Sequence, residues 1–272
     1  MNEQGAADAR AKWTPNSEGR HAFVLPAYGC SPFLNACLSS LVHQDVRSRI
    51  VVTTSTPSRF IEDAAHAHRV SVVVNPIRDG IAADWNFALQ ATDARYVTLA
   101  HQDDVYAASF TEQTLAAFDR SDGTLCFTGY QEVDDDGRVV ASKISRVKHL
   151  LAAVTIGRRN RPSPARLRAF LSLGNPLPCS SVTLDRRRLP DFSFSAGYAS
   201  NLDWDAWWRL LLQGERFLSV PNRLVGRRHN AQTATAALIA DGRRRSEDLM
   251  MFRRIWPAPL SEAVATLYRF SY

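Results

Sequence analysis

The feature that most constrains the fold is a repeated alternation of apolar strands and amphipathic helices across residues 21–106. Four short runs rich in Val, Ile and other apolar residues are separated by patterns with helical periodicity. The expected strands are 21–25, 49–54, 70–74 and a run that begins at Tyr96. Continuous apolar strands joined by helices are typical of a parallel sheet covered on both faces. The sequence therefore predicts an α/β fold with a mostly parallel central sheet flanked by helices.

The carboxyl ends of these strands fall at 26–28, 53–55, 75–78 and 102–104. Open parallel sheets bind their ligands outside the carboxyl ends of the strands, so we expect the functional site at this edge. The chain contains neither a GxGxxG nor a GxxxxGK[ST] motif. Their absence argues against a dinucleotide-binding Rossmann domain and against a P-loop.

Two adjacent carboxylates, Asp103 and Asp104, follow the strand that begins at Tyr96. Neighbouring carboxylates repel each other, and a divalent cation between them relieves the repulsion. Mg²⁺ and Mn²⁺ bind one or two carboxylates together with the phosphates of a substrate. The alternative is an ordinary solvated turn, since Asp is common where strands end. The acidic run 134–136 is interpreted as such a turn, within a hairpin.

A second pair of carboxylates, Asp203 and Asp205, falls in the first turn of a helical pattern that starts near residue 201. A carboxylate there is favoured by the helix dipole, which is the purely structural interpretation. The functional interpretation is a general base at the mouth of a pocket lined by indole rings. The rings in question belong to Trp204, Trp207 and Trp208, which equally fit a helix packed into the core.

Composition places the chain among soluble globular proteins, with 45% hydrophobic and 22% charged residues. No apolar run approaches the roughly 18 residues that would span a bilayer, and the polar N-terminus lacks a signal-peptide core. We therefore expect a cytoplasmic protein with four reduced cysteines, since no CxxC pair occurs. The net charge of +6 favours anionic partners such as phosphates, nucleic acid or membrane headgroups.

Along residues 21–235 the chain resembles a family 2 glycosyltransferase with the GT-A fold. Five segments carry the resemblance, in the family's order and with plausible spacing. They are Pro26-Ala27-Tyr28 (the family's VIPAYN), Asn75 to Tyr96 (N.G...N.al..A.gdYi), His101-Gln102-Asp103-Asp104 (a variant DxD motif), Leu202-Asp203-Trp204-Asp205 (EDwdlwlRl) and Arg227-Arg228-His229 with Gln232-Thr233 (R.H..q.T).

The resemblance implies a role for each matching residue. Asp103, with Asp104, would hold a divalent metal, Mn²⁺ or Mg²⁺, against the diphosphate of a nucleotide-sugar donor. Asp203 would be the general base that deprotonates an acceptor hydroxyl, with Asp205 as the alternative. The residues that would line or support the donor site are Ala27, Tyr28, Thr54, Asn75, Arg78, Asn86, Gln102, Arg228 and His229.

The activity implied is that of a metal-dependent hexosyl- or deoxyhexosyltransferase that acts on a glycan or lipid-linked acceptor in the synthesis of a cell-surface polysaccharide or lipopolysaccharide. One base without a second nucleophilic carboxylate favours single displacement with inversion. A sugar-phosphate nucleotidyltransferase would need a Gly-rich loop with a basic residue after the first strand, and 26–30 does not supply one. A catalytically degenerate nucleotide-binding module stays open. Nucleic-acid binding ranks last, because the arginines are dispersed and no RNA-binding aromatic signature is present.

The chain departs from the family pattern in three segments. Thr53, Thr54 and Ser55 stand where the family carries acidic residues, one of which contacts the nucleotide base. The donor nucleotide is therefore left open. His101 replaces the first Asp of the DxD motif, and Leu202 replaces the Glu before the base.

The expected organisation is a flexible leader at 1–20, one catalytic domain at 21–240 and a helical tail at 241–272. The catalytic domain would divide into a nucleotide-sugar-binding half (21–108) and an acceptor-binding half (109–240), with an irregular basic loop at 142–165. In the tail, arginines alternate with Leu, Met, Phe and Trp. That mix suits a peripheral helix at an anionic membrane surface, and it equally suits a helix packed on the domain or on a second subunit.

Overall fold

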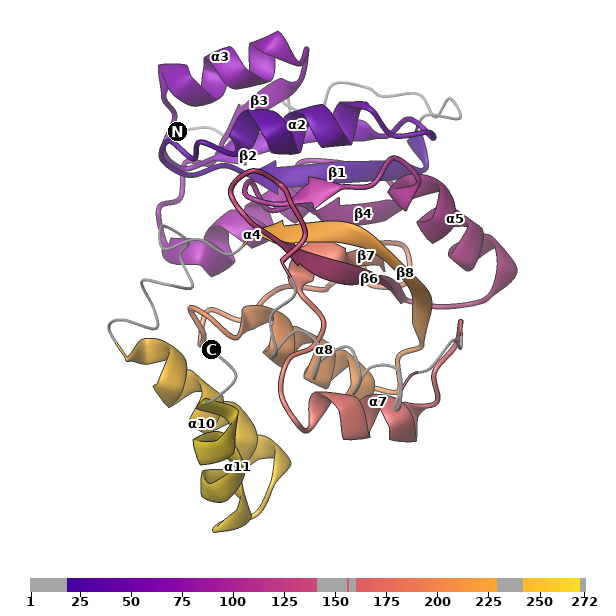
Figure 1. The fold of residues 1–272 in the computed structure, drawn as a ribbon, viewed down its shortest axis with the longest axis vertical. Helices are drawn as coiled ribbons and strands as arrows, with labels where there is room; N and C mark the ends of the chain where they lie inside the picture. The colour runs from indigo at the N-terminus through magenta and orange to yellow at the C-terminus, as the bar shows by residue number, and fades with distance from the viewer. Residues whose placement is uncertain (1–18, 141–155, 157–159, 229–241, 270–272) are drawn as a thin grey trace.

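A computed structural model describes residues 19–140, 156, 160–228 and 242–269 of the chain (Figure 1). Its centre is one eight-stranded sheet with the strand order β3-β2-β1-β4-β7-β6-β8-β5. The strands are β1 (His21–Pro26), β2 (Arg49–Thr54), β3 (Ser71–Val74), β4 (Tyr96–Leu99), β5 (Val105–Tyr106), β6 (Leu125–Val133), β7 (Val182–Asp185) and β8 (Phe217–Arg228). The helices are α2 (Leu34–Val42), α3 (Arg59–Ala67), α4 (Gly80–Gln90), α5 (Phe110–Arg120), α7 (Pro164–Leu171), α8 (Leu202–Leu212), α10 (Arg243–Ile255) and α11 (Leu260–Tyr268), with a 3₁₀ turn η2 at Cys179–Ser181.

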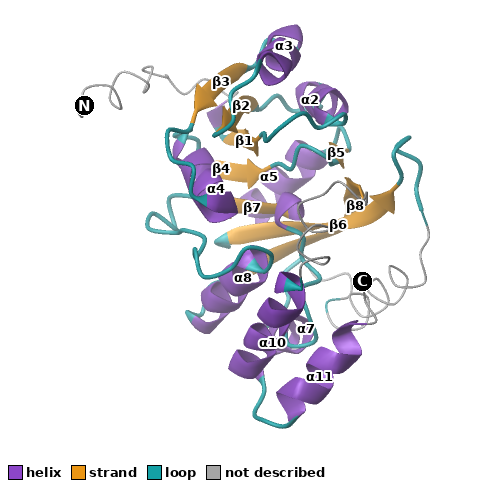
Figure 2. Cartoon of the chain, turned by 90° about the vertical axis from the view of Figure 1, so that its left-hand side faces the viewer, coloured by secondary structure: helices purple, strands orange, loops and turns teal. Residues whose placement is uncertain are grey.

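The first four strands in sequence form the parallel half of the sheet, as the sequence predicts. β1 lies between β2 and β4 and runs parallel to both, and β3 extends the same parallel array beyond β2. Successive side chains of a strand point to opposite faces. Accordingly Ala22 and Val24 pack with α4, α7, α8 and α10, whereas Phe23 and Leu25 pack with α2, α3 and α5. Figure 2 shows these helical layers on the two sides of the sheet.

The other half of the sheet is mixed, and one of its strands is not anticipated by the sequence pattern. β7 is only four residues long and runs antiparallel to both β4 and β6. It follows a Pro- and Ser-rich segment, so its pattern is too short to stand out. The parallel β6–β8 pair and the antiparallel β5–β8 pair complete the sheet.

β8 is longer than the sequence indicates. The apolar pattern predicts a strand that ends near Val220, before Pro221, with the basic cluster after it. In the structure the strand continues to Arg228, because the pairing with β6 shifts register around Gly129 and accommodates Pro221. Arg227 and Arg228 therefore lie within a strand rather than after one.

The tail packs back on the domain, which is one of the alternatives that the sequence leaves open. Met251 and Phe252 of α10 are fully buried in the same core cluster as α8. The rings of Phe252 and Trp204 lie edge-to-face with centroids 5.0 Å apart. None of the helices in the described part of the chain combines the length and apolarity that a membrane crossing requires.

Candidate active site

The loops after β1 and β4 are locked together by one side chain. The Gln102 amide nitrogen donates to the backbone carbonyl of Tyr28 (3.1 Å), and its amide oxygen accepts from the backbone N–H of Tyr28 (3.0 Å). Ala27 is tied to the next strand, since its N–H donates to the carbonyl of Thr53 (2.7 Å). The Tyr28 ring is left 64% exposed at this edge. Three predicted site residues, Ala27, Tyr28 and Gln102, are thus brought together at the carboxyl ends of adjacent strands.

The two carboxylates after β4 have different surroundings. Asp103 is partly exposed, and its Oδ1 accepts a hydrogen bond from the Ser31 hydroxyl (2.6 Å). Asp104 is buried; its Oδ1 accepts from the backbone N–H of Arg228 (3.1 Å), and its Oδ2 is buried with no hydrogen-bond partner. A merely solvated turn does not account for a buried carboxylate. Asp103 remains partly exposed, and Asp104 ties the loop to β8.

The Arg228 side chain supports this loop by donating hydrogen bonds to backbone carbonyls. Its Nε donates to the carbonyl of Asp103 (3.1 Å), its Nη1 donates to the carbonyl of Asp134, and its guanidinium lies 4.2 Å from the centroid of the Phe33 ring. The side chain is almost fully buried by these contacts. The neighbouring candidate, His229, lies outside the described residues.

A carboxylate that the sequence analysis missed lies at the carboxyl ends of β2 and β3. Asp84 of α4 accepts hydrogen bonds from the Ser55 hydroxyl (3.0 Å) and from the Asn75 amide (2.9 Å). Asn75 is buried and also accepts from the N–H of Ile77 (3.0 Å). The only signal in the sequence was a lone acid within the apolar helical run 81–89. The predicted residue Thr54 belongs to the same framework, because its carbonyl accepts from the Asn75 N–H (2.7 Å) and its hydroxyl accepts from the Thr56 N–H (3.0 Å).

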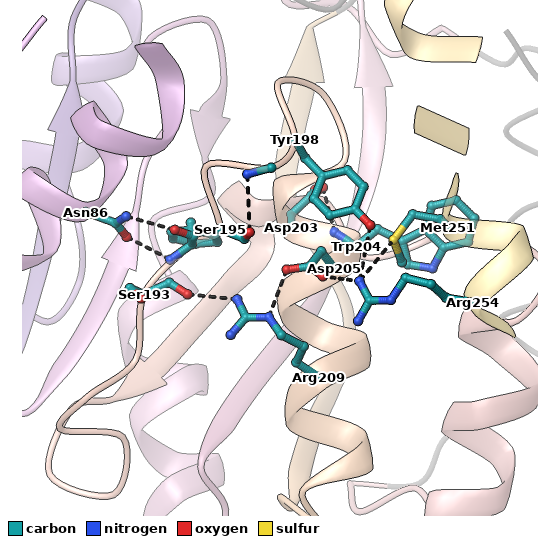
Figure 3. A network of polar contacts seen from close by, with 12 residues as sticks. Asn86, Ser193, Ser195, Tyr198, Asp203, Trp204, Asp205, Arg209, Met251 and Arg254 are labelled. Carbon is teal, nitrogen blue, oxygen red and sulfur yellow. Dashed lines mark hydrogen bonds and ion pairs between the residues drawn. The ribbon is translucent and has the colours of Figure 1, made fainter. Parts of the chain in front are cut away.

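Two predicted donor residues are placed differently from the rest. Arg78 lies in the loop before α4 with an exposed side chain. Asn86 faces away from that loop and brackets Phe194, donating to its carbonyl (2.9 Å) and accepting from its N–H (2.7 Å) (Figure 3). Asn86 therefore holds the segment 192–201, which leads into α8. Trp85, another residue the sequence analysis missed, packs between the rings of His101 (5.2 Å) and Phe194 (4.9 Å).

Asp203 lies at the start of α8 and is close enough to His101, next to the Asp pair, for the His charge to act on it. Its Oδ1 accepts from the backbone N–H of Trp204 (2.8 Å). Burial raises the pKa of the Asp203 carboxyl above its usual range, and the positive charge of Arg244 is the main opposing influence. The hydrogen bonds from Trp204 and Asn175 and the charge of His101 also oppose the rise. A carboxylate with a raised pKa is a suitable proton acceptor.

Asp205, two residues later, is engaged elsewhere. Its side chain is 2% exposed and pairs with Arg209 Nε (2.8 Å) and with Arg254 Nη1. Arg209 in turn donates to the carbonyl of Ser193 (2.8 Å), and Arg254 donates to the Tyr198 hydroxyl (3.2 Å), as Figure 3 shows. Asp205 is thus the centre of an ion-pair network that joins α8, α10 and the segment 192–201.

The interpretation of the α8 indoles as a pocket lining is wrong. All three are buried in the core. Trp204 donates to the carbonyl of Leu171 (2.9 Å) and Trp207 to that of Leu177 (3.0 Å). Their apolar periodicity reflects packing against the sheet and α7, because a fully buried helix face needs bulky side chains.

Comparison with known proteins agrees with this architecture. The family model described as Glycosyl transferase family 2 matches residues 22–187, and no curated protein matches the chain. Among solved structures, S. aureus TarS 1–349 in complex with UDP-GlcNAc has a TM-score of 0.59 at 14% identity, over 80% of this chain and 61% of that one. This chain therefore spans less than two thirds of the TarS fragment.

Two further structures match over more of their own length. The mannosyltransferase PcManGT from Pyrobaculum calidifontis, in complex with GDP-Man and Mn²⁺, has a TM-score of 0.63 at 15% identity, over 97% of this chain and 75% of that one. Glucosyl-3-phosphoglycerate synthase from Mycobacterium tuberculosis, in complex with UDP, has a TM-score of 0.55 at 18% identity, over 90% and 86%. These likenesses show the fold, and the family match covers more than half of the chain. The chain belongs to glycosyl transferase family 2 and has the GT-A fold.

Proposed function

We propose that this protein transfers a sugar, of the hexosyl or deoxyhexosyl type, from a nucleotide-sugar donor to an acceptor hydroxyl with the help of a divalent metal ion. The observation that carries the proposal is the position of Asp203. The segment that leads into α8 and Asp203 meets the loop that carries Asp103 at Trp85, although α8 and β4 are about a hundred residues apart in sequence. The Trp85 ring centroid lies 4.9 Å from that of Phe194 and 5.2 Å from that of His101. An acceptor bound between Asp203 and that loop would have a proton acceptor on one side and the donor phosphates on the other.

The donor is proposed to bind at the carboxyl ends of β1, β2 and β3. Support comes from the polar framework of Gln102, Tyr28, Asn75 and Asp84 at that edge and from the complexes of similar GT-A proteins with UDP-GlcNAc and GDP-Man. Ser55 takes the place of the family's usual acid after β2, and the structure brings the Asp84 carboxylate to it. The identity of the donor nucleotide is therefore a question for the thermal-unfolding panel described below.

The residues after β4 fit a divalent metal, Mn²⁺ or Mg²⁺. Asp103 is partly exposed and oriented by Ser31, and Asp104 carries a buried oxygen without a hydrogen-bond partner. Among the described residues no group of three or more His, Cys, Asp and Glu side chains is arranged to hold a metal. An ion shared with a diphosphate needs only one or two carboxylates. When bound, it would offset the charge that develops on the leaving nucleoside diphosphate.

Asp203 is proposed as the general base that takes the proton from the acceptor hydroxyl as the sugar is transferred. General-base catalysis contributes about 10²–10⁴-fold. Asp205 is held by two arginines and is not placed to act as a nucleophile. One displacement, with inversion at the anomeric carbon, follows from a single base. A product with retained configuration, determined by NMR, would contradict this step.

The acceptor is proposed to be a glycan or a lipid-linked precursor of a cell-surface polysaccharide, reached by peripheral contact with the inner face of the membrane. Support for contact comes from the net charge of +6 and from Leu260 and Leu267 of α11, which are 44% and 69% exposed. Co-sedimentation with vesicles of phosphatidylglycerol, compared with phosphatidylcholine alone, tests it. If the protein binds neither kind of vesicle, membrane contact is no longer part of the proposal.

The donor and metal are tested by thermal unfolding with UDP, GDP, CDP, ADP and dTDP, each with and without Mn²⁺. A ligand that binds only the folded protein stabilises it by about 2.7 kcal/mol at a concentration of 100 times Kd. We expect one nucleotide to raise Tm only when Mn²⁺ is present, and the shift to vanish in Asp103→Ala. No shift with any nucleotide would contradict the proposal.

A further inference from the structure

The helix α10 lies beyond the part of the chain that the family model matches, yet it is bonded to the turn from which α8 begins. Both Glu247 carboxylate oxygens accept backbone hydrogen bonds there. One accepts from Ala199 (2.8 Å), and the other accepts from Ser200 (2.8 Å) and Asn201 (3.0 Å). Three successive N–H groups bonded to one buried carboxylate fix the conformation of this turn.

Neighbouring residues of α10 bind the same turn through side chains. The Asn201 amide nitrogen donates to Asp248 Oδ1 (2.8 Å), whereas an Asn at this position commonly caps its own helix. Arg244 Nη1 donates to the Ser200 hydroxyl (2.8 Å), and its Nε lies 3.3 Å from Asp248 Oδ1. Because the Arg244 side chain is only 15% exposed, its charge is poorly screened by water.

Asp203 comes two residues after this turn, and Arg244 is the strongest of the influences that favour its charged form. The other groups that face Asp203 are His101 from the loop after β4 and Cys179 from η2, together with the neutral donors Asn175 and Trp204 N–H. Burial works in the opposite direction. The bond from Arg244 to Ser200 thus brings a positive charge from a separate, later helix to the start of α8, where it favours the charged form of Asp203.

We propose that Arg244 and Glu247 of α10 are positioning residues for the general base: Glu247 fixes the turn that starts α8, and Arg244, bonded to Ser200 of that turn, holds a buried positive charge at the end of α8 that carries Asp203. The inference rests on the proposed role of Asp203. If these roles are correct, α10 contributes directly to the geometry of the site. Both residues would act through their contacts within the protein, so the proposal does not require either of them to touch the substrate.

The first test follows the ionisation of Asp203 by NMR, with ¹³C at the side-chain carboxyl of aspartate and the Asp203 signal identified by its loss in Asp203→Asn. Loss of the Arg244 charge should move the Asp203 titration midpoint to higher pH, because one stabilising influence on the carboxylate is gone. Arg244→Lys should keep the wild-type midpoint. Arg244→Met and Arg244→Gln are both measured, since the glutamine can still donate to Ser200 if the methionine variant folds poorly.

The matched control is Arg253→Met, which removes an arginine from the same helix at an exposed pair with Glu262. It should leave the Asp203 midpoint where it is. An unchanged midpoint in folded Arg244→Gln would overturn the role of Arg244. This measurement needs no substrate, so its outcome is independent of whether the protein transfers a sugar.

The second test uses turnover, measured as release of nucleoside diphosphate from the donor that the thermal panel selects. Glu247→Gln should lower kcat by about 10–100-fold, since small displacements of a catalytic group are costly, with the donor KM unchanged. Arg244→Gln should shift the acid limb of the kcat profile to higher pH. A Glu247→Gln enzyme with wild-type kcat would refute the positioning role, whereas an active Asp203→Asn enzyme would refute the base assignment itself.

Discussion

Asp203 and Asp205 lie on the same turn of α8, and their amide variants should fail in opposite ways. Asp205→Asn removes the negative charge that pairs with Arg209 and Arg254. Asp203→Asn removes a carboxylate whose pKa is raised by burial and whose proposed task is chemical. The first change should affect stability and the second should affect turnover.

The cost of Asp205→Asn follows from the burial of its three groups. Removing one partner of a buried ion pair costs about 3–5 kcal/mol, because the other charge is left buried and uncompensated. Here the aspartate is 2% exposed, but the Arg209 and Arg254 side chains are 33% and 40% exposed. Both guanidinium groups can therefore recover hydration, which reduces the cost to about 2–3 kcal/mol. At about 2–4 °C per kcal/mol for a chain of this size, Tm should fall by about 4–12 °C.

Asp203→Asn should behave differently. A neutral amide avoids the burial cost that raises the pKa of the carboxyl, so Tm should stay at the wild-type value or rise. The loss of a general base should lower kcat by about 10²–10⁴-fold. Nucleotide binding in the presence of Mn²⁺ should persist in both variants, because the donor framework is built on other elements.

The assay combines thermal unfolding by circular dichroism with release of nucleoside diphosphate at a fixed saturating donor concentration. The reasoning is refuted if Asp205→Asn keeps the wild-type Tm and loses turnover while Asp203→Asn remains active. That result would make Asp205 the base and would require its ion pairs to open during the reaction.

Three further predictions concern other parts of the fold. Ser31→Ala removes the hydrogen bond that orients Asp103 (2.6 Å). The apparent Kd for the nucleotide in the presence of Mn²⁺ should rise by about 10-fold or more, as for the loss of other groups that support metal ligands. An unchanged Kd in a titration would contradict this prediction. Gln102→Leu breaks both bonds to the Tyr28 backbone, at about 1 kcal/mol each, and should weaken nucleotide binding more than it lowers Tm, which calorimetry can separate. His21 is buried between Ser48 and Thr98, and burial lowers its pKa to about 3. The fold therefore holds His21 neutral while the unfolded chain protonates it below pH 6.5, and the free energy of unfolding should fall by about 1.4 kcal/mol per unit as pH drops from 6.5 to about 3. In His21→Asn this part of the slope, measured by denaturant titration, should disappear.

The parallel half of the fold could be predicted because its signals are local. Each of its strands is an apolar run with a helix after it, and polar residues mark the ligand edge. β7 and the far end of β8 do not show in the sequence pattern, for a different reason. β7 is four residues that pair between β4 and β6, and β8 continues past Pro221 because it bulges there, with two residues between Val220 and Arg223 left without a partner in β6. Both depend on partners far away in sequence.

Site residues divide in the same way. The positions of Ala27, Tyr28, Gln102 and Asp103 follow from strand ends, and the structure brings them together. The contacts of Asp84 with Ser55 and of Asn86 with Phe194 arise from how α4 lies across the sheet. No pattern within α4 tells which of its polar side chains faces the donor edge and which faces the segment before α8.

The two halves of the proposed site are held by different kinds of interaction, and this difference has a consequence for function. The donor side is fixed by hydrogen bonds without ion pairs between the groups described, namely the neutral bonds of Gln102 with Tyr28 and the bonds that the Asp84, Asp103 and Asp104 carboxylates accept from neutral donors. The side that carries Asp203 is held by charged groups: Glu247 on three N–H groups, and Asp205 between Arg209 and Arg254. Partly exposed ion pairs weaken with salt, whereas neutral hydrogen bonds do so much less. Raising the salt concentration at saturating donor should therefore lower kcat through the pairs of Asp205 with Arg209 and Arg254, and a kcat that does not respond to salt would show that these pairs do not support the base.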